Sequence, residues 1–97
     1  MEEINKELKK YRLVLMKFSA PWCGACQMMQ PTIEKVKETN SDVHFMEINV
    51  DENLDVANHY KIMGLPTIKM FKDEKEVGSY NGAMSVDSLQ ELISKNR

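Results

Sequence analysis

The chemistry of this chain centres on its only two cysteines, Cys23 and Cys26, which are separated by two residues. Thiols at this spacing on the first turn of a helix can close into a small, reversible disulfide. Such a short ring stabilises a fold by roughly 2 kcal/mol, compared with about 3 kcal/mol for a fifteen-residue loop. Because the pair is a weak cross-link, we interpret it as reactive and expect it to cycle between dithiol and disulfide.

The two thiols are predicted to have different roles. Cys23 lies at the start of a predicted helix, where free N–H groups and the helix dipole favour an anion. Cys26, one turn later, is expected to be more buried and to donate its S–H to the Cys23 sulfur. Cys23 should therefore attack a substrate disulfide, and Cys26 should resolve the mixed disulfide that forms. The alternative is a pair of ordinary buried thiols.

Metal and cofactor sites are not favoured by the residue spacing. Zinc requires four ligands, and the cysteine pair supplies two. His44 and His59 have fourteen residues between them, well beyond the roughly three to five of a zinc finger. An iron–sulfur cluster shared between the cysteine pairs of two chains is possible in principle but is not indicated. The chain also lacks a glycine-rich phosphate loop, so we expect neither a metal nor a bound cofactor.

Length and composition limit the class of protein. The 97 residues, 42% of them hydrophobic and 29% charged, suffice for one domain over residues 1–97. The net charge of −2 provides no basic field for nucleic acid. No stretch approaches the ~20 apolar residues of a membrane span, and residues 1–10 lack the apolar segment of a secretory signal. We therefore expect a cytoplasmic monomer with no nucleic-acid or membrane partner.

The elements that position the cysteines follow from hydrophobic periodicity. Helices are expected over residues 2–10, from near Trp22 to Asn40, around 54–60, and after a capping Ser85. Strands are expected over residues 13–18, 43–50, 67–71 and 76–80. Pro31 lies inside the second helix and should kink it.

The connections between these elements predict the topology. The long helix after the first strand makes the first two strands parallel, and the short turn at 72–75 makes the last two a hairpin. The expected fold is therefore α/β, a mixed four-stranded sheet flanked on both faces by four helices.

Several motifs resemble those of the thioredoxin family, in the right order and over almost the whole chain. They are Ala20 and Trp22-Cys23-Gly24 followed two residues later by Cys26, like the active-site signature; Pro31, like the helix-kinking proline; Asn49-Val50-Asp51, like the end of the central strand; Gly64-Leu65-Pro66-Thr67, like the cis-proline loop; and Gly82, like the glycine after the hairpin.

The resemblance implies a thioredoxin fold, with the usual first edge strand short or missing because the N-terminal segment is too short for it. It also implies an enzyme: a disulfide reductase that carries electrons to protein disulfides, maintains cell redox homeostasis and is recharged by a thioredoxin reductase, a flavoenzyme. The alternatives are a glutaredoxin-like or isomerase-type oxidoreductase, or a redox-independent binding module using the same groove.

The resemblance further implies where substrate binds. A cis peptide between Leu65 and Pro66 would face the cysteines, and the Leu65 backbone would pair with an extended substrate strand. Trp22 would shield one side of the Cys23 sulfur and contact substrate. Met63 and Gly82 complete the expected substrate-binding residues. The alternatives are that Trp22 belongs to the core and that Pro66 merely begins a strand.

The chain departs from the family pattern at positions that should tune the site. Ala25 follows Gly24 where thioredoxins usually have proline, so the dithiol loop is freer and its redox potential should differ. Lys17 replaces a buried aspartate, Ser19 a common tryptophan, and Glu47 a usual lysine.

Strand alternation places Lys17 and Glu47 on one face of neighbouring strands. A lone buried charge there is costly, so we expect them to pair, with Glu47 transferring the proton of Cys26 and Lys17 offsetting its charge. The alternative is that both side chains extend to solvent.

Overall fold

The computed structural model describes all 97 residues and places the elements in the predicted order. The helices are α1 (Glu2–Lys10), α2 (Gly24–Met28), α3 (Gln30–Glu38), α4 (Leu54–His59) and α5 (Val86–Lys95). The strands are β1 (Leu13–Ser19), β2 (His44–Asn49), β3 (Thr67–Lys72) and β4 (Lys75–Asn81). None of the helices has the length and apolar composition needed to cross a membrane.

The sheet has four strands in the order β2-β1-β3-β4. β1 and β2 are parallel, whereas β3 is antiparallel to both β1 and β4. The parallel pair and the hairpin are therefore confirmed. The N-terminal segment forms α1 and adds no strand beyond β2, which confirms that the first edge strand is missing.

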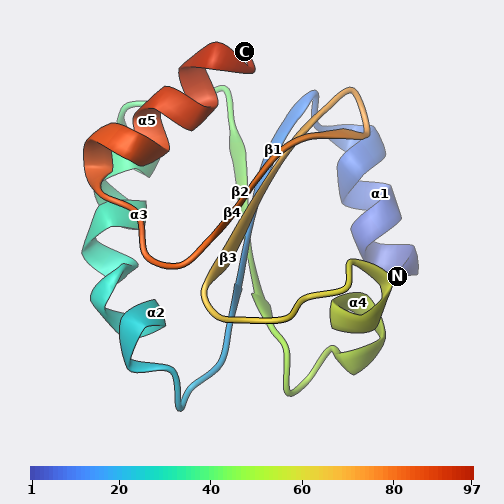
Figure 1. The fold of residues 1–97 in the computed structure, drawn as a ribbon. Helices are drawn as coiled ribbons and strands as arrows, with labels where there is room; N and C mark the ends of the chain where they lie inside the picture. The colour runs from blue at the N-terminus through green and yellow to red at the C-terminus, as the bar shows by residue number, and fades with distance from the viewer.

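Helices cover both faces of the sheet, with α2, α3 and α5 on one side and α1 and α4 on the other (Figure 1). The expected number of four helices was wrong by one, because the helix predicted from Trp22 to Asn40 is divided at Met29 into α2 and α3. Pro31 is the reason: it cannot donate a backbone hydrogen bond inside a helix, but it is tolerated in the first turn. It accordingly occupies the first turn of α3.

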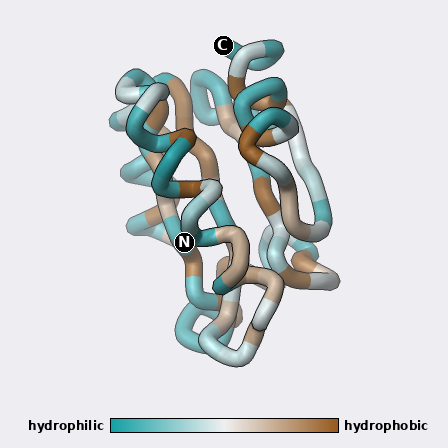
Figure 2. Tube along the Cα trace, turned by 90° about the vertical axis from the view of Figure 1, so that its left-hand side faces the viewer, coloured by the Kyte–Doolittle hydropathy of each residue, from teal (hydrophilic) through white to brown (hydrophobic).

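Two hydrophobic clusters hold these layers together, one on each face of the sheet. β1 contributes to both clusters, because its side chains alternate between the two faces of the sheet and six of its seven residues are buried. Figure 2 shows brown hydrophobic segments interleaved with teal hydrophilic ones along the chain, as expected of elements with one buried face. Ser85 accepts a hydrogen bond from the Ser88 N–H at 3.1 Å, which confirms it as the cap of α5.

Candidate active site

The cysteines lie where the chain passes from β1 to α2. After Ser19 the backbone turns, with the Cys23 N–H donating to the Ala20 carbonyl at 3.1 Å. Cys23 is the N-cap of α2, and its Sγ accepts the backbone N–H of Cys26 at 3.2 Å. The helix end therefore directs a backbone donor at the first sulfur, as predicted from its position.

Cys23 and Cys26 are joined as a disulfide, with their Cα atoms 5.3 Å apart. Both are buried, Cys26 more deeply at 2% exposure against 7% for Cys23. They line different cavities: Cys23 contributes to an apolar groove and Cys26 to a polar cavity. The two sulfurs of one short ring thus have different surroundings.

The apolar groove, of about 460 Å³, lies between the turn that precedes α2, helix α4 and the loop before β3. Trp22 forms one wall, and it is 69% exposed, so it is a surface residue and not part of the core. Its Nε1 donates to Asp51 Oδ2 at 2.8 Å, which holds the indole beside Cys23. Leu54 and Met63 also line the groove and are 65% and 93% exposed. A large apolar surface therefore adjoins the first sulfur.

The loop before β3 borders the same groove. The Leu65–Pro66 peptide is cis, as the resemblance implied. Leu65 lines the groove and packs against the small cluster that Cys23 and Cys26 form with Ala20. Gly82 has a φ of +105°, a conformation that suits glycine, and its N–H donates to the Pro66 carbonyl at 2.7 Å. Gly82 thus supports the loop but lines neither cavity.

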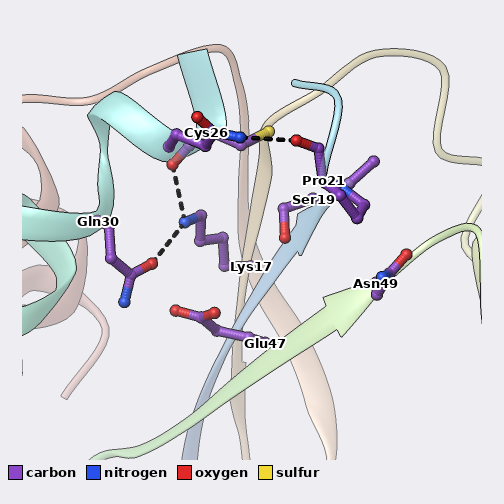
Figure 3. A pocket seen from close by; sticks show the side chains of 9 residues that line it. Lys17, Ser19, Pro21, Cys26, Gln30, Glu47 and Asn49 are labelled. Carbon is purple, nitrogen blue, oxygen red and sulfur yellow. Dashed lines mark hydrogen bonds between the residues drawn. The ribbon is translucent and has the colours of Figure 1, made fainter. Parts of the chain in front are cut away.

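The polar cavity, of about 520 Å³, lies behind Cys26. Lys17 extends into it from β1 and is only 3% exposed. Its Nζ donates to the Cys26 carbonyl oxygen and to Gln30 Oε1, each at 3.0 Å (Figure 3). Gln30 begins α3, so the ammonium connects β1 to both halves of the divided helix.

The expected ion pair between Lys17 and Glu47 was wrong. The two residues are register partners on β1 and β2 and line the same cavity, yet no salt bridge joins them. Figure 3 shows the Lys17 ammonium directed toward Cys26 and Gln30 and away from the Glu47 carboxylate. Glu47 lies on the edge strand and is exposed, so it keeps its hydration without a partner. The solvent-facing alternative therefore holds for Glu47 but not for buried Lys17.

The structure adds two residues to the site that were not among the expected site residues, Asp51 and Gln30. Asp51 lies two residues after the end of β2; the motif Asn49-Val50-Asp51 pointed to it, but its hydrogen bond to the Trp22 indole was not expected. Gln30 carried no signal, since an amide near a proline in a helix is ordinary. Gly24 and Ala25 lie exposed on the outer turn of α2, and open space surrounds Gly24.

A disulfide that can open at a helix N-terminus, beside a groove large enough for a peptide, is suited to exchange with other disulfides. By its fold and its cysteine pair, the chain is a thiol–disulfide oxidoreductase. The family model for thioredoxin matches residues 1–95, and the chain belongs to the thioredoxin family.

Individual relatives agree with this assignment. Thioredoxin of Gallus gallus is 39% identical over 95 residues, covering 96% of this chain and 90% of its own. Thioredoxin-2 of Pyricularia oryzae is 36% identical over 98% of this chain, which spans only 55% of that relative's length. The crystal structure of oxidised mitochondrial thioredoxin 3 from Saccharomyces cerevisiae has a TM-score of 0.92 at 32% identity, covering 97% of this chain and 88% of its own.

Proposed function

We propose that this protein is a thioredoxin-type disulfide reductase, in which Cys23 is the attacking thiol and Cys26 the resolving thiol. The observation that carries the proposal is the placement of the two sulfurs: Cys23 lines the exposed apolar groove, whereas Cys26 lies behind it on the polar cavity. A substrate disulfide in the groove meets Cys23 first. Cys26 is held close enough to displace the substrate afterwards, because the two cysteines already form a ring.

The reaction has two exchanges. The Cys23 thiolate attacks one sulfur of a substrate disulfide, and the other substrate sulfur leaves as a thiolate and is protonated. Cys26 then loses its proton and attacks Cys23 Sγ, which forms the Cys23–Cys26 disulfide and releases the second substrate sulfur as a thiolate. Two electrons pass to the substrate. A thioredoxin reductase, a flavoenzyme, would restore the dithiol.

The same proposal assigns substrate recognition to the rim of the groove. The exposed faces of Trp22 and Met63 offer apolar contact to a peptide. Leu65 offers backbone groups to an extended strand, while Pro66 and Gly82 shape the loop that carries it. The substrates are protein disulfides with apolar neighbours, and the setting is a cytoplasmic monomer engaged in electron transport and redox homeostasis.

Reduction of insulin disulfides by dithiothreitol tests this function. The unmodified protein is expected to accelerate insulin precipitation, because its dithiol relays electrons faster than dithiothreitol alone. The double variant Cys23→Ser/Cys26→Ser should fall to the rate of dithiothreitol alone. A redox-independent binding module would retain partner binding in the double variant and would show no acceleration in either form.

Glu47 is proposed to receive the Cys26 proton through the polar cavity that both residues line. Glu47→Gln keeps the shape but removes the base, so insulin reduction should slow several-fold near neutral pH and its pH profile should change. The effect is smaller than the roughly 10²–10⁴-fold contributed by general acid–base groups, because water in the cavity can also accept the proton. The rate is measured across the pH range against the unmodified protein. An unchanged profile removes Glu47 from the mechanism and leaves proton transfer to solvent.

An isomerase-type role is the second candidate, and Ala25 is the residue that favours it. Alanine leaves both its own φ and the conformation of Gly24 less restricted than proline would, which alters the balance between dithiol and disulfide. Equilibration of the protein against glutathione buffers measures that balance. A potential near that of thioredoxins supports the reductase, and a markedly more oxidising one supports the isomerase.

A further inference from the structure

A buried cation lies directly behind the resolving cysteine. We infer that Lys17 stabilises the Cys26 thiolate by its positive charge, and that Gln30 is the positioning residue that holds the Lys17 ammonium against helix α2. The inference rests on the proposed function, since only a protein that resolves a mixed disulfide needs the Cys26 thiolate. It adds Gln30 as a residue that sets the reactivity of that thiolate.

The contacts of Lys17 leave its charge without a compensating carboxylate. Both hydrogen-bond acceptors of the ammonium, the Cys26 carbonyl oxygen and Gln30 Oε1, are neutral, and each lies at 3.0 Å. The side chain is almost completely buried, so water and salt screen its field weakly. Because the ammonium donates to the backbone carbonyl of Cys26 itself, its electrostatic field acts at the residue that must ionise.

Gln30 is held in one orientation by a second contact. Its Nε2 donates to Glu34 Oε1 at 3.0 Å, one turn further along α3. Because the amide nitrogen is committed to that carboxylate, the amide oxygen is presented to Lys17. The first turn of α3 therefore fixes where the ammonium points (Figure 3).

The other charged groups around Cys26 are few and more exposed. Glu47, from β2, is the only other charged residue lining the polar cavity, and it is exposed. Glu34 reaches the cavity only through Gln30. Asp51, after β2, is directed to the Trp22 indole on the groove side. The buried Lys17 therefore has the strongest effect on the charge of Cys26.

The cation acts at one point of the exchange. Cys26 gives its proton to Glu47 or to water in the cavity, and the resulting thiolate attacks Cys23 Sγ in the mixed disulfide. The bond between Cys23 and the substrate sulfur breaks as the Cys23–Cys26 bond forms, and the substrate leaves as a thiolate. Lys17 accepts neither proton nor electrons. It raises the population of the thiolate that makes the attack.

The two exchanges can be measured separately with a limiting amount of the aromatic disulfide DTNB. The reduced protein releases one coloured thiolate when Cys23 attacks and a second when Cys26 resolves the adduct. An opposite charge within ~4–6 Å lowers the pKa of an acid by about 1–3, and a change of one in pKa changes the thiolate population about tenfold. In Lys17→Met the second phase should therefore be about tenfold slower at neutral pH, and its pH profile should be displaced toward higher pH.

Gln30 is tested in the same assay. Gln30→Met frees the Lys17 ammonium to move toward Glu47. The second phase should slow by a few-fold, and its pH profile should be displaced toward higher pH, as in Lys17→Met. Gln30→Glu places a carboxylate on Lys17 and should displace the profile at least as far. Gln27→Met is the matched control, because Gln27 lines the same cavity but donates to the Pro21 carbonyl. Its profile should match that of the unmodified protein.

The outcomes separate the two ideas. A displaced profile in Lys17→Met with an unchanged one in both Gln30 variants removes Gln30 from its positioning role. Unchanged profiles in all three variants overturn the role of Lys17 as well. If the unmodified protein shows no first phase, Cys23 does not attack disulfides, and the proposed function fails independently of the inference.

Discussion

The variant Cys26→Ser is expected to remain covalently attached to its protein substrates. Cys23 still faces the apolar groove and can form the mixed disulfide, but the hydroxyl that replaces the Cys26 thiol cannot displace the substrate. Turnover in the insulin assay should fall at least about a hundredfold, since removal of a group that takes part in covalent exchange is among the most costly changes to a catalyst. Non-reducing gel electrophoresis of the reaction should show the adduct.

The reciprocal variant provides the control. Cys23→Ser leaves Cys26 on the polar cavity, behind the groove, so it should neither turn over nor accumulate an adduct. Treatment with dithiothreitol should release the trapped substrate from Cys26→Ser, which shows that the link is a disulfide. If Cys23→Ser forms adducts as readily as Cys26→Ser, the assignment of attacking and resolving thiols is reversed or absent.

Phe18→Ala is expected to cause a large loss of stability. Phe18 lies on the central strand β1, is fully buried, and packs near Tyr60 with ring centroids 5.9 Å apart. Truncating a buried phenylalanine costs about 3–5 kcal/mol, because the lost apolar contact is compounded by the cavity left behind. In a domain of this size each kcal/mol lowers Tm by roughly 4–8 °C. Urea and thermal unfolding of the oxidised protein measure the loss.

Leu54→Ala is the matched comparison. Leu54 is also a large apolar residue, but it is 65% exposed on the rim of the groove. Its truncation should change the free energy of unfolding by no more than about 0.5 kcal/mol, while weakening substrate reduction. Equal losses of stability in the two variants would show that the layer of α1 and α4 does not pack on β1 as the structure has it.

Burial beneath α1 and α4 also changes the pKa of Tyr60, which packs near Phe18. Burial raises the pKa of Tyr60, and the negative charge of Glu76 adds to the effect. The phenol is part of an aromatic cluster with Phe18 and Phe71, at the side of the sheet that carries α1 and α4. It lines neither cavity beside the cysteines, so the shift belongs to the core and not to the proposed chemistry.

Much of the fold followed from local features of the sequence. The apolar run at Leu13–Phe18, the breaker before Thr67 and the short turn near Asp73 indicated strands and their pairing, because such patterns act over a few residues. The reactive cysteine pair was equally local. The division of the helix at Met29 shows the limit of this reasoning: a proline signals an interruption, but the hydrogen bonds of the folded helix decide whether it bends or separates into two segments.

The sequence by itself determined the four-stranded sheet and the cysteine pair, whereas the surface position of Trp22 was decided by the structure. The tertiary structure decided that the two cysteines line different cavities, that Asp51 holds the indole, and that Lys17 binds Cys26 and Gln30 in preference to Glu47. The reason is physical: a long charged side chain can reach several partners. Which one it reaches depends on elements distant in the chain that only folding brings within hydrogen-bonding distance.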